Sequence, residues 1–160
     1  MPVDIFLKMD PVKGESKDSK HKDEVEIQSF GFGASQSGTF GSGSGGGAGK
    51  VSIQDLSLTH YMDSASPSLF QACSQGTHFD KALLTVRKAG GKDALEYLKI
   101  TLEDVLISSF QDSVHSGDER PMESFSLNFR KITYDYTTQT EKGGAGSSNP
   151  VTWDVAANSE

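Results

Sequence analysis

The stretch from Lys50 to Gly76 constrains the fold most, because its hydrophobic period changes once, from that of a strand to that of a helix. In its first half, apolar and polar residues alternate, which is typical of a half-buried strand. The alternation slips after Val51 and Ile53, since the leucines that follow fall on the opposite face. A bulge near Gln54 would restore one buried face. This half therefore predicts one long, bulged strand.

The second half predicts one short flanking helix, from about Pro67 to Gln75. Ser66 suits the N-cap, and proline suits the first helical position because its missing N–H is not needed there. Gly76 supplies a left-handed stop. The apolar stripe of the helix contains Leu69, Phe70 and Cys73. A helix this short is unstable alone, so it must pack on a sheet.

The rest of the chain predicts further strands, bounded by glycine and polar turns. The predicted strands cover residues 3–9, 24–33, 78–88, 95–110, 124–136 and 151–155. Gly90 and Gly91 predict a hairpin turn. A slip between Phe129 and Ile132 predicts a second bulge, or a strand shared between two sheets. The sequence thus predicts one all-β domain over residues 1–160, a barrel or a sandwich.

Composition excludes several classes of function. The net charge is −7 and the basic residues are scattered, which argues against a nucleic-acid partner. No stretch approaches the roughly 18 apolar residues of a membrane span, and the first apolar run is too short for a signal peptide. We therefore expect a protein made in the cytosol, without membrane insertion. The single Cys73 excludes an intrachain disulfide and fits a reducing compartment.

The glycine tract has the glycine spacing of a nucleotide-binding loop, but the sequence predicts no helix directly after it. Gly41, Gly43 and Gly46 match the spacing of a dinucleotide fingerprint, which needs a helix directly after it to receive the phosphates. Here a predicted strand follows instead. The pair Gly49 and Lys50 lacks the other residues of a Walker loop. We expect an extended, glycine-rich loop and no cofactor.

The sequence contains no catalytic or metal-binding constellation. The four histidines are isolated, without the spacing of a metal site, and are expected at the surface or at strand edges. No nucleophile elbow is present, and the acidic residues are dispersed. Cys73 on an apolar helix stripe is expected to be a small buried hydrophobe. The sequence therefore predicts no enzyme, no metal and no cofactor. The histidines are His21, His60, His78 and His115.

The energetics of the glycine tract favour self-assembly. Nine of the 17 glycines lie between Gly31 and Gly49, so the tract brings few side chains to bury. Ordering each residue costs roughly 1–2 kcal/mol of backbone entropy. A monomer cannot offset that cost, so we expect the tract to be either disordered or ordered only when another subunit packs against it. Unpaired strand edges favour the same conclusion.

An ordered set of motifs resembles one family over nearly the whole chain. The motifs are Asp4-Ile-Phe-Leu-Lys8, Gly14-Glu-Ser-Lys-Asp18, His21-Lys-Asp-Glu24, Ser35-Gln-Ser-Gly38, Gly49-Lys-Val-Ser-Ile-Gln-Asp-Leu-Ser57, Ala65-Ser-Pro67, Thr85-Val-Arg-Lys-Ala-Gly-Gly91, Glu96-Tyr-Leu-Lys-Ile-Thr101 and Leu127-Asn-Phe129. Together they resemble the haemolysin co-regulated protein (Hcp) family, the tube protein of the bacterial type VI secretion system.

The resemblance implies a β-barrel of two sheets with a flanking helix, assembled as a homo-hexameric ring. Such rings stack into a tube inside a contractile sheath on a baseplate, with a spike protein at the tip. The lumen can carry and protect effector proteins. The resemblance also implies export by the machine itself, from the cytoplasm to the outside or into a target cell, and a structural role without an active site.

The resemblance also assigns candidate site residues. The extended loop is expected to contact neighbouring subunits and the next ring. Its candidate residues are Gly38, Thr39, Phe40, Gly41, Gly43, Gly45, Gly46, Gly47 and Gly49. Gly31 occupies the position of a family serine near the lumen wall, between two phenylalanines where family members often have tryptophans. Ser35, Gln36 and Ser37 are the nearest polar candidates for effector contact.

Two other classes remain open from the sequence. The first is a stand-alone β-barrel module that binds a small polar ligand or a carbohydrate at its mouth. The second is a hydrolase whose triad assembles only in space. Mass in solution separates a ring from a lone module, and a screen of ester and peptide substrates addresses the hydrolase.

Overall fold

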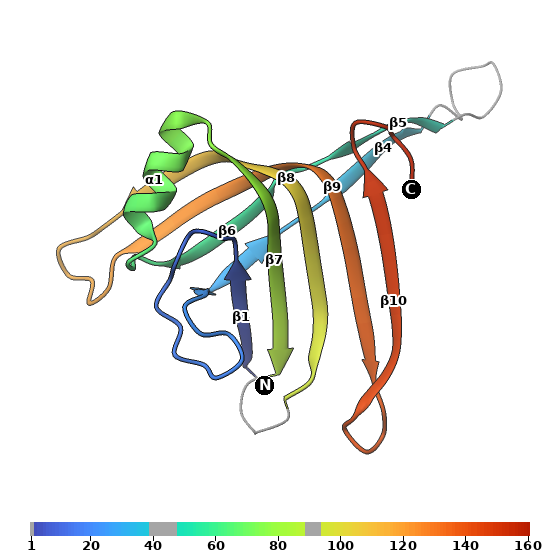
Figure 1. Cartoon of the computed structure of the whole chain (residues 1–160), viewed down its shortest axis with the longest axis horizontal. Helices are drawn as coiled ribbons and strands as arrows, with labels where there is room; N and C mark the ends of the chain where they lie inside the picture. Colours follow the sequence, from blue (N-terminus) through green and yellow to red (C-terminus); the bar gives the residue numbers. More distant parts are fainter. Residues whose placement is uncertain (1, 39–47, 89–93) are drawn as a thin grey trace.

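The computed structural model describes residues 2–38, 48–88 and 94–160, and strands make up most of it (Figure 1). The elements are β1 Val3–Lys8, β2 Val25–Ile27, β3 Ser29–Gly31, β4 Ala34–Gly38, β5 Ala48–Ile53, β6 Leu56–Tyr61, α1 Ser66–Gln75, β7 His78–Lys88, β8 Glu96–Ser113, β9 Met122–Gln139 and β10 Ala145–Asp154. This confirms the predicted all-β class with one short helix. The predicted turn at Gly90 and Gly91 lies outside the described residues, but β7 and β8 do pair antiparallel.

Eight strands form one sheet in the order β2-β1-β7-β8-β9-β6-β3, with β10 paired to β9 beside that path. The two ends of this order, β2 and β3, are consecutive in the chain. Ile27 of β2 lies opposite Ile5 of β1, whereas Phe30 of β3 lies opposite Leu58 of β6. The Gln28 N–H between them donates to the Thr59 carbonyl at 2.7 Å. The predicted strand over 24–33 is therefore a bent seam that curls the sheet into a nearly closed barrel.

Apolar side chains fill the barrel interior, and many of them come from the two longest strands, β8 and β9. The most deeply buried of these side chains include Leu7, Leu56, Leu58, Leu69, Leu84, Ile100, Leu102, Val105 and Leu127. The predicted change of phase in β9 is present, because Phe129 and Ile132 are both buried. The buried residues of β8 change phase at the same point, since Leu102 lies opposite Ile132 and Val105 lies opposite Phe129. Asp104, with a φ of 53°, lets β8 change phase there. The register shift between these strands lies elsewhere, near Ile107.

The prediction of one bulged strand from Lys50 to Tyr61 is wrong. The chain leaves β5 at Ile53 and enters a different sheet at Leu56, with β5 in the two-stranded ribbon and β6 in the barrel. The Gln54 N–H donates to the Gly33 carbonyl at 2.9 Å and fixes this junction. The phase slip thus marks a change of sheet, from half-exposed Val51 and Ile53 to fully buried leucines.

The helix is where it was predicted, but its first turn is different. Ala65 is the N-cap, and the hydroxyl of Ser66 donates instead to Glu123 of β9 at 3.0 Å. Gly76 provides the predicted left-handed end, with a φ of 64°. Leu69 is buried, but Phe70 is 60% exposed, so its place on the buried stripe is wrong. No helix of the described part has both the length and the apolarity to cross a membrane.

Candidate assembly surface

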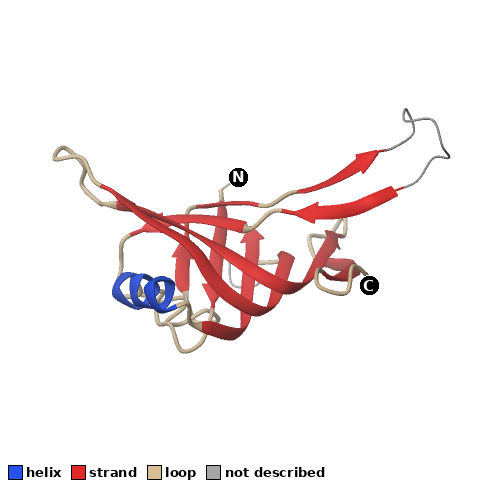
Figure 2. Ribbon diagram, turned by 90° about the horizontal axis from the view of Figure 1, so that it is seen from above, coloured by secondary structure: helices blue, strands red, loops and turns tan. Residues whose placement is uncertain are grey.

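The most prominent feature outside the barrel is the ribbon of β4 and β5, which projects from one end of the molecule (Figure 2). Every described residue of β4 is exposed. Among the predicted interface residues, Gly38 ends β4 and pairs with Ala48, and Gly49 lies in β5. A Cβ on Gly49 would come within 2.3 Å of the Ser37 hydroxyl and 3.3 Å of the Ser37 carbonyl oxygen, so a larger residue here would require the exposed Ser37 side chain to turn away.

The other predicted interface residues lie outside the described part of the chain. They are Thr39, Phe40, Gly41, Gly43, Gly45, Gly46 and Gly47. The described ends of the predicted loop are strand rather than loop, because β4 and β5 pair from Ala34 opposite Ile53 outward. The described residues on either side of the glycine tract therefore form a two-stranded ribbon.

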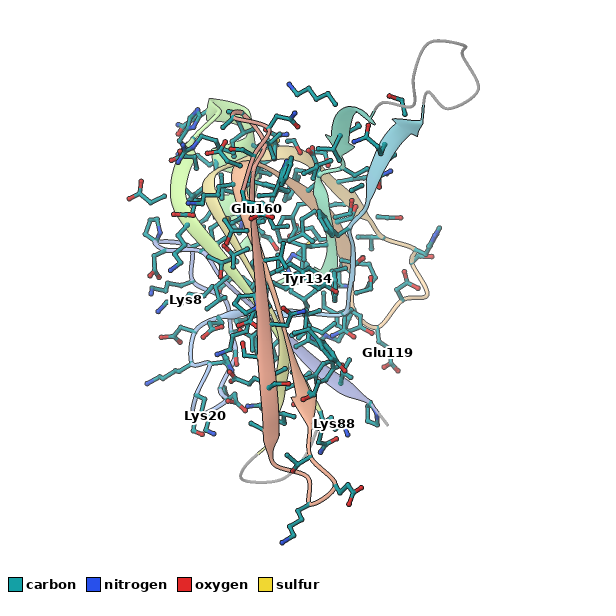
Figure 3. The ribbon with its side chains drawn as sticks, turned by 90° about the vertical axis from the view of Figure 1, so that its right-hand side faces the viewer. Lys8, Lys20, Lys88, Glu119, Tyr134 and Glu160 are labelled. Atoms are coloured by element: carbon teal, nitrogen blue, oxygen red, sulfur yellow. The ribbon has the colours of Figure 1, made fainter. Side chains whose placement is uncertain are left out.

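An apolar groove of about 270 Å³ lies where the ribbon meets the barrel. The side chains that line it come from the base of the ribbon, from β9 and from β10. They are Phe32, Ala34, Val51, Ile53, Ile132, Tyr134, Val151 and Trp153. Tyr134 is 42% exposed and Val151 is 55% exposed, and Figure 3 shows Tyr134 between β10 and the ribbon. Exposed apolar surface of this kind marks a site for a partner.

Strand β10 borders the groove and leaves one edge without a strand partner in the described structure. Its one strand partner there is β9, for example Val151 opposite Tyr134, and only its last residue, Asp154, forms a further bridge, to Ser159. Its first seven residues are all exposed. Free backbone N–H and C=O groups along such an edge can pair with a further strand, although Pro150 removes one donor. The groove and this edge together form a surface that the chain itself does not cover.

A different face of the barrel is lined with small hydroxyl groups. Outward-facing residues form two cross-strand rows over β3, β6 and β9. The rows are Gly31, Ser57 and Ser126, and Ser29, Thr59 and Ser124. Hydroxyls within this face bond to one another, with Ser29 and Thr59 joined at 2.6 Å. The face is polar and without charge along these rows.

The structure separates the predicted effector-contact residues. Gly31 lies in the hydroxyl face, and a Cβ there would meet no atom within 4 Å, so the position is open. Ser35, Gln36 and Ser37 lie on the ribbon strand β4 instead. The sequence analysis missed the serines of β6 and β9. Their signal was present, because they alternate with core residues such as Leu56 and Leu58.

Two of the four histidines are buried, contrary to the prediction that all lie at the surface or at strand edges. His78 and His115 are exposed. His21 is 7% exposed and His60 is fully buried, because each has carboxylate partners inside the chain. Ser66 donates to Glu123 rather than to His60, so these three residues do not form a nucleophilic triad. No cluster suited to a metal ion occurs within residues 2–38, 48–88 and 94–160.

Comparisons with known proteins identify the family. The model of the family "Type VI secretion system effector, Hcp" matches residues 6–136. Protein hcp1 of Pseudomonas aeruginosa is 51% identical over 160 residues, covering 99% of this chain and 98% of that protein. A solved structure described as a type six secretion system protein has a TM-score of 0.92 at 33% identity, covering 98% of each chain.

Hcp1 from Salmonella typhimurium is also similar in structure, with a TM-score of 0.80 and 38% identity over 99% of each chain. The family match spans most of the barrel strands, and the structural matches extend over nearly the entire chain. These findings agree with the nearly closed barrel, the single helix and the projecting ribbon described above. This chain belongs to the Hcp family of type VI secretion system proteins.

Proposed function

We propose that the chain, as one domain over residues 1–160, is the tube subunit of a type VI secretion system. Six copies form a ring, and rings stack into a tube that the contractile sheath drives from the baseplate, with a spike protein at its tip. The subunit is made in the cytoplasm, leaves the cell through the machine and carries effector proteins in its lumen. Its role is structural, without catalysis. Membership of the Hcp family supports this proposal.

The observation that carries the proposal is the uncovered surface where the ribbon meets the barrel. A ring needs head-to-tail contacts, so two different faces of each chain must fit together. The apolar groove and the free edge of β10 form one such face. We infer that a neighbouring copy covers it, because burial of apolar surface contributes about 25 cal/mol per Å².

We assign the glycine tract and the ribbon to contacts between copies. The described ribbon of β4 and β5, which includes Gly38 and Gly49, projects beyond the barrel, where a second subunit or the next ring can pack on it. We expect deletion of residues 41–47 to leave the barrel folded, because these residues are all glycine or serine and bring no apolar side chain, and to weaken stacking. Tube length in electron micrographs is the measurement, and tubes of unchanged length would contradict this assignment.

We assign the hydroxyl face to the lumen, in contact with effectors. Small hydroxyls bind varied polar surfaces by hydrogen bonds without a fixed charge, which suits a carrier of several cargoes. This assignment places Gly31 beside Ser57 on the lumen wall and leaves Ser35 to Ser37 on the ribbon as further candidates for effector contact.

Light scattering after size exclusion, followed by negative-stain imaging, tests the ring. The chain mass is 17.2 kDa, and we expect about six times that mass in solution. Val151→Glu places a charge in the groove and should dissociate the ring. Val114→Glu is a matched control, because Val114 is 56% exposed and lies outside the groove. A wild-type chain that stays monomeric at high concentration would contradict the ring and favour a stand-alone binding module.

A further inference from the structure

A buried acid and a buried imidazole face each other beneath α1. His60 of β6 and Glu123 of β9 are direct cross-strand partners. His60 is 0% exposed and Glu123 is 1% exposed, and the His60 Nε2 lies 2.6 Å from the Glu123 Oε2. So short a distance between two fully buried groups requires a proton between them. The question is how many protons the pair holds.

The surroundings of the pair are acidic. Asp63 Oδ2 lies 3.8 Å from the His60 Nδ1, and Asp112 of β8 is the other cross-strand neighbour of Glu123. Two further carboxylates, Glu15 and Glu26, act on Asp63. The nearby guanidinium of Arg120 lies over the Tyr61 ring, 4.2 Å from its centre. An ionised Glu123 would therefore add a buried anion to a group of carboxylates.

The remaining contacts of the pair are apolar or neutral. The Phe125 ring stands edge-on to the imidazole at 5.4 Å, and Ser66 at the start of α1 donates to the Glu123 Oε2. Among the described residues, neither the His60 Nδ1 nor the Glu123 Oε1 has a hydrogen-bond partner. A full ion pair buried here would leave both charges poorly solvated, which is costly.

We propose that His60 and Glu123 share a single proton, as a neutral imidazole and a neutral carboxylic acid, and that this uncharged pair is the latch that fixes the N-terminus of α1 to the barrel. Glu123 Oε2–H donates to His60 Nε2, and Oε2 in turn accepts from Ser66. The His60 Nδ1–H then points to the side of Asp63. The latch loosens when the pair gains a second proton or loses the one it holds.

The pKa shifts agree with this geometry. Burial, reinforced by Asp112, raises the pKa of Glu123 to about 7. Burial lowers the pKa of His60 to about 4, although Asp112 opposes it. Burial also raises the pKa of Asp63. In the unfolded chain the proton lies on His60, with a pKa of 6.5, and Glu123, with a pKa of 4.5, is ionised.

A specific pH dependence follows. Between about pH 4.5 and 6.5 the pair holds one proton whether the chain is folded or unfolded, so it adds no pH dependence to stability. Above this range folded Glu123 ionises near pH 7, and stability falls as pH rises. Below it folded His60 becomes charged near pH 4, and stability falls as pH drops.

Single substitutions should show two pH dependences of folding stability with opposite signs. In Glu123→Gln, His60 titrates alone, so the folding equilibrium constant relative to wild type should fall up to tenfold per pH unit as pH drops from 6.5 to 4.5. In His60→Gln, it should fall up to tenfold per unit as pH rises from 4.5 to 6.5. Ser66→Ala is the matched control, because it removes a hydrogen bond of the latch but no titrating group. It should lower stability about equally between pH 4.5 and 6.5, where the pair holds one proton in both states.

Nitrogen NMR of wild-type His60 tests the same proposal without any variant that must fold. At pH 5.5 we expect a neutral ring with Nδ1 protonated, and amide exchange in residues 66–75 should speed up, after correction for intrinsic rates, from pH 6 to 8. An imidazolium ring at pH 5.5, or slopes of the same sign in the two glutamine variants, would overturn the shared proton. Exchange in α1 that stays unchanged from pH 6 to 8 would overturn the latch.

Discussion

Two aromatic side chains of the barrel sheet, one on its outer face and one on its inner face, are covered differently. On β1, the outward-facing Phe6 is 4% exposed because the loop of residues 9–24 lies over it. On β9, Tyr134 lies on the inner face of the sheet, because it alternates with Ile132 and lies opposite Ile100 of β8, yet it is 42% exposed and lines the apolar groove. The first aromatic ring is covered by its own chain, whereas the second is not. The described chain thus covers the outward Phe6 and leaves the inward-facing Tyr134 open at the groove.

Contacts between basic side chains and carboxylates hold the covering loop, residues 9–24, against the barrel. His21 stacks on Phe6 with ring centres 4.4 Å apart and lies between Glu24, at 3.0 Å, and Glu96 of β8, at 2.7 Å. Arg87 of β7 lies over the same Phe6 ring at 4.9 Å. Its guanidinium binds Asp4 and Asp18, so this side of the barrel satisfies its own charges.

The groove side offers no comparable charged clamp within the described chain. All its lining side chains are apolar or aromatic, and Arg130 nearby binds Asp104 and Asp154 at the surface. Apolar contact with a second copy would cover it under the assembly proposed above. The comparison shows that charged contacts within the chain close one side of the barrel, whereas the described chain leaves the groove side open.

The largest expected effect separates the two aromatic residues. Phe6→Ala should lower the free energy of unfolding by about 3–5 kcal/mol, because it leaves a cavity under the loop. Tyr134→Ala should change the stability of the dissociated chain by less than about 0.5 kcal/mol and reduce ring formation instead. Urea denaturation and light scattering provide the two measurements. Equal losses of stability in both variants would break the comparison.

The next effect tests the charged clamp. Glu96→Gln should cost about 1.5–3 kcal/mol at pH 7, because His21 loses a charged partner. Burial opposes it, but the bonds from His21 and Lys99 lower the pKa of Glu96 below 4.5. Its contribution is thus present above pH 4.5 and lost as pH falls, so wild type and variant should converge in acid.

Glu103→Gln on the same strand is the control for this clamp. Glu103 is exposed and lies 3.8 Å from Lys131, so its loss should cost less than about 1 kcal/mol at either pH. If Glu96→Gln lowered stability no more than Glu103→Gln, the loop would be held by the stacking of His21 on Phe6 alone.

A smaller effect is expected at Arg87. Arg87→Lys keeps the charge but loses the planar contacts to two carboxylates, and we expect a cost of about 1 kcal/mol. The hydrogen bond from Arg87 lowers the pKa of Asp18 to about 2, so this contribution is present above pH 3.8 and lost as pH falls towards 2. Arg130→Lys, on the groove side, should change stability less. Denaturation at pH 7 and pH 3 compares the two, and equal costs would remove the distinction.

The smallest effect concerns the tyrosine hydroxyl. Tyr134→Phe keeps the ring in the groove and should leave both ring formation and stability within about 0.5 kcal/mol of wild type. Sedimentation of this variant beside Tyr134→Ala separates apolar contact from hydrogen bonding. Dissociation of the Tyr134→Phe ring would show that the groove recognises a polar group.

Alternation along the chain was enough to predict the all-β class and most of the barrel strands, and the change to a helical period predicted α1. It left a barrel and a sandwich both open and did not predict the ribbon strand β4. It could not predict that Phe6 is buried, because its cover is a stacked histidine fifteen residues away in a charged loop. It also misplaced Phe70, since adjacent helical residues lie about 100° apart and Leu69 already faces the core. The sequence pattern also could not predict the partner of His60, because Glu123 lies on a strand distant in the chain.

The candidate assembly surface was predicted only in part. The glycine tract is visible in the sequence as a low-complexity segment, whereas the groove depends on β9 and β10 meeting the base of the ribbon. The hydroxyl face depends on register, because Ser57 and Ser126 are brought together by strand pairing across a long separation in the chain. Long-range pairing of this kind leaves no local signal.

The seam at Gln28 has a consequence for biosynthesis. On the two sides of this seam, β1 pairs with β7 and β6 pairs with β9. The barrel therefore cannot close until most of the polypeptide has left the ribosome. Strand β10 is then added to a structure that is already complete. Protease protection of stalled nascent chains should therefore first appear after β9 has emerged, and earlier protection would show that the amino-terminal hairpins fold on their own.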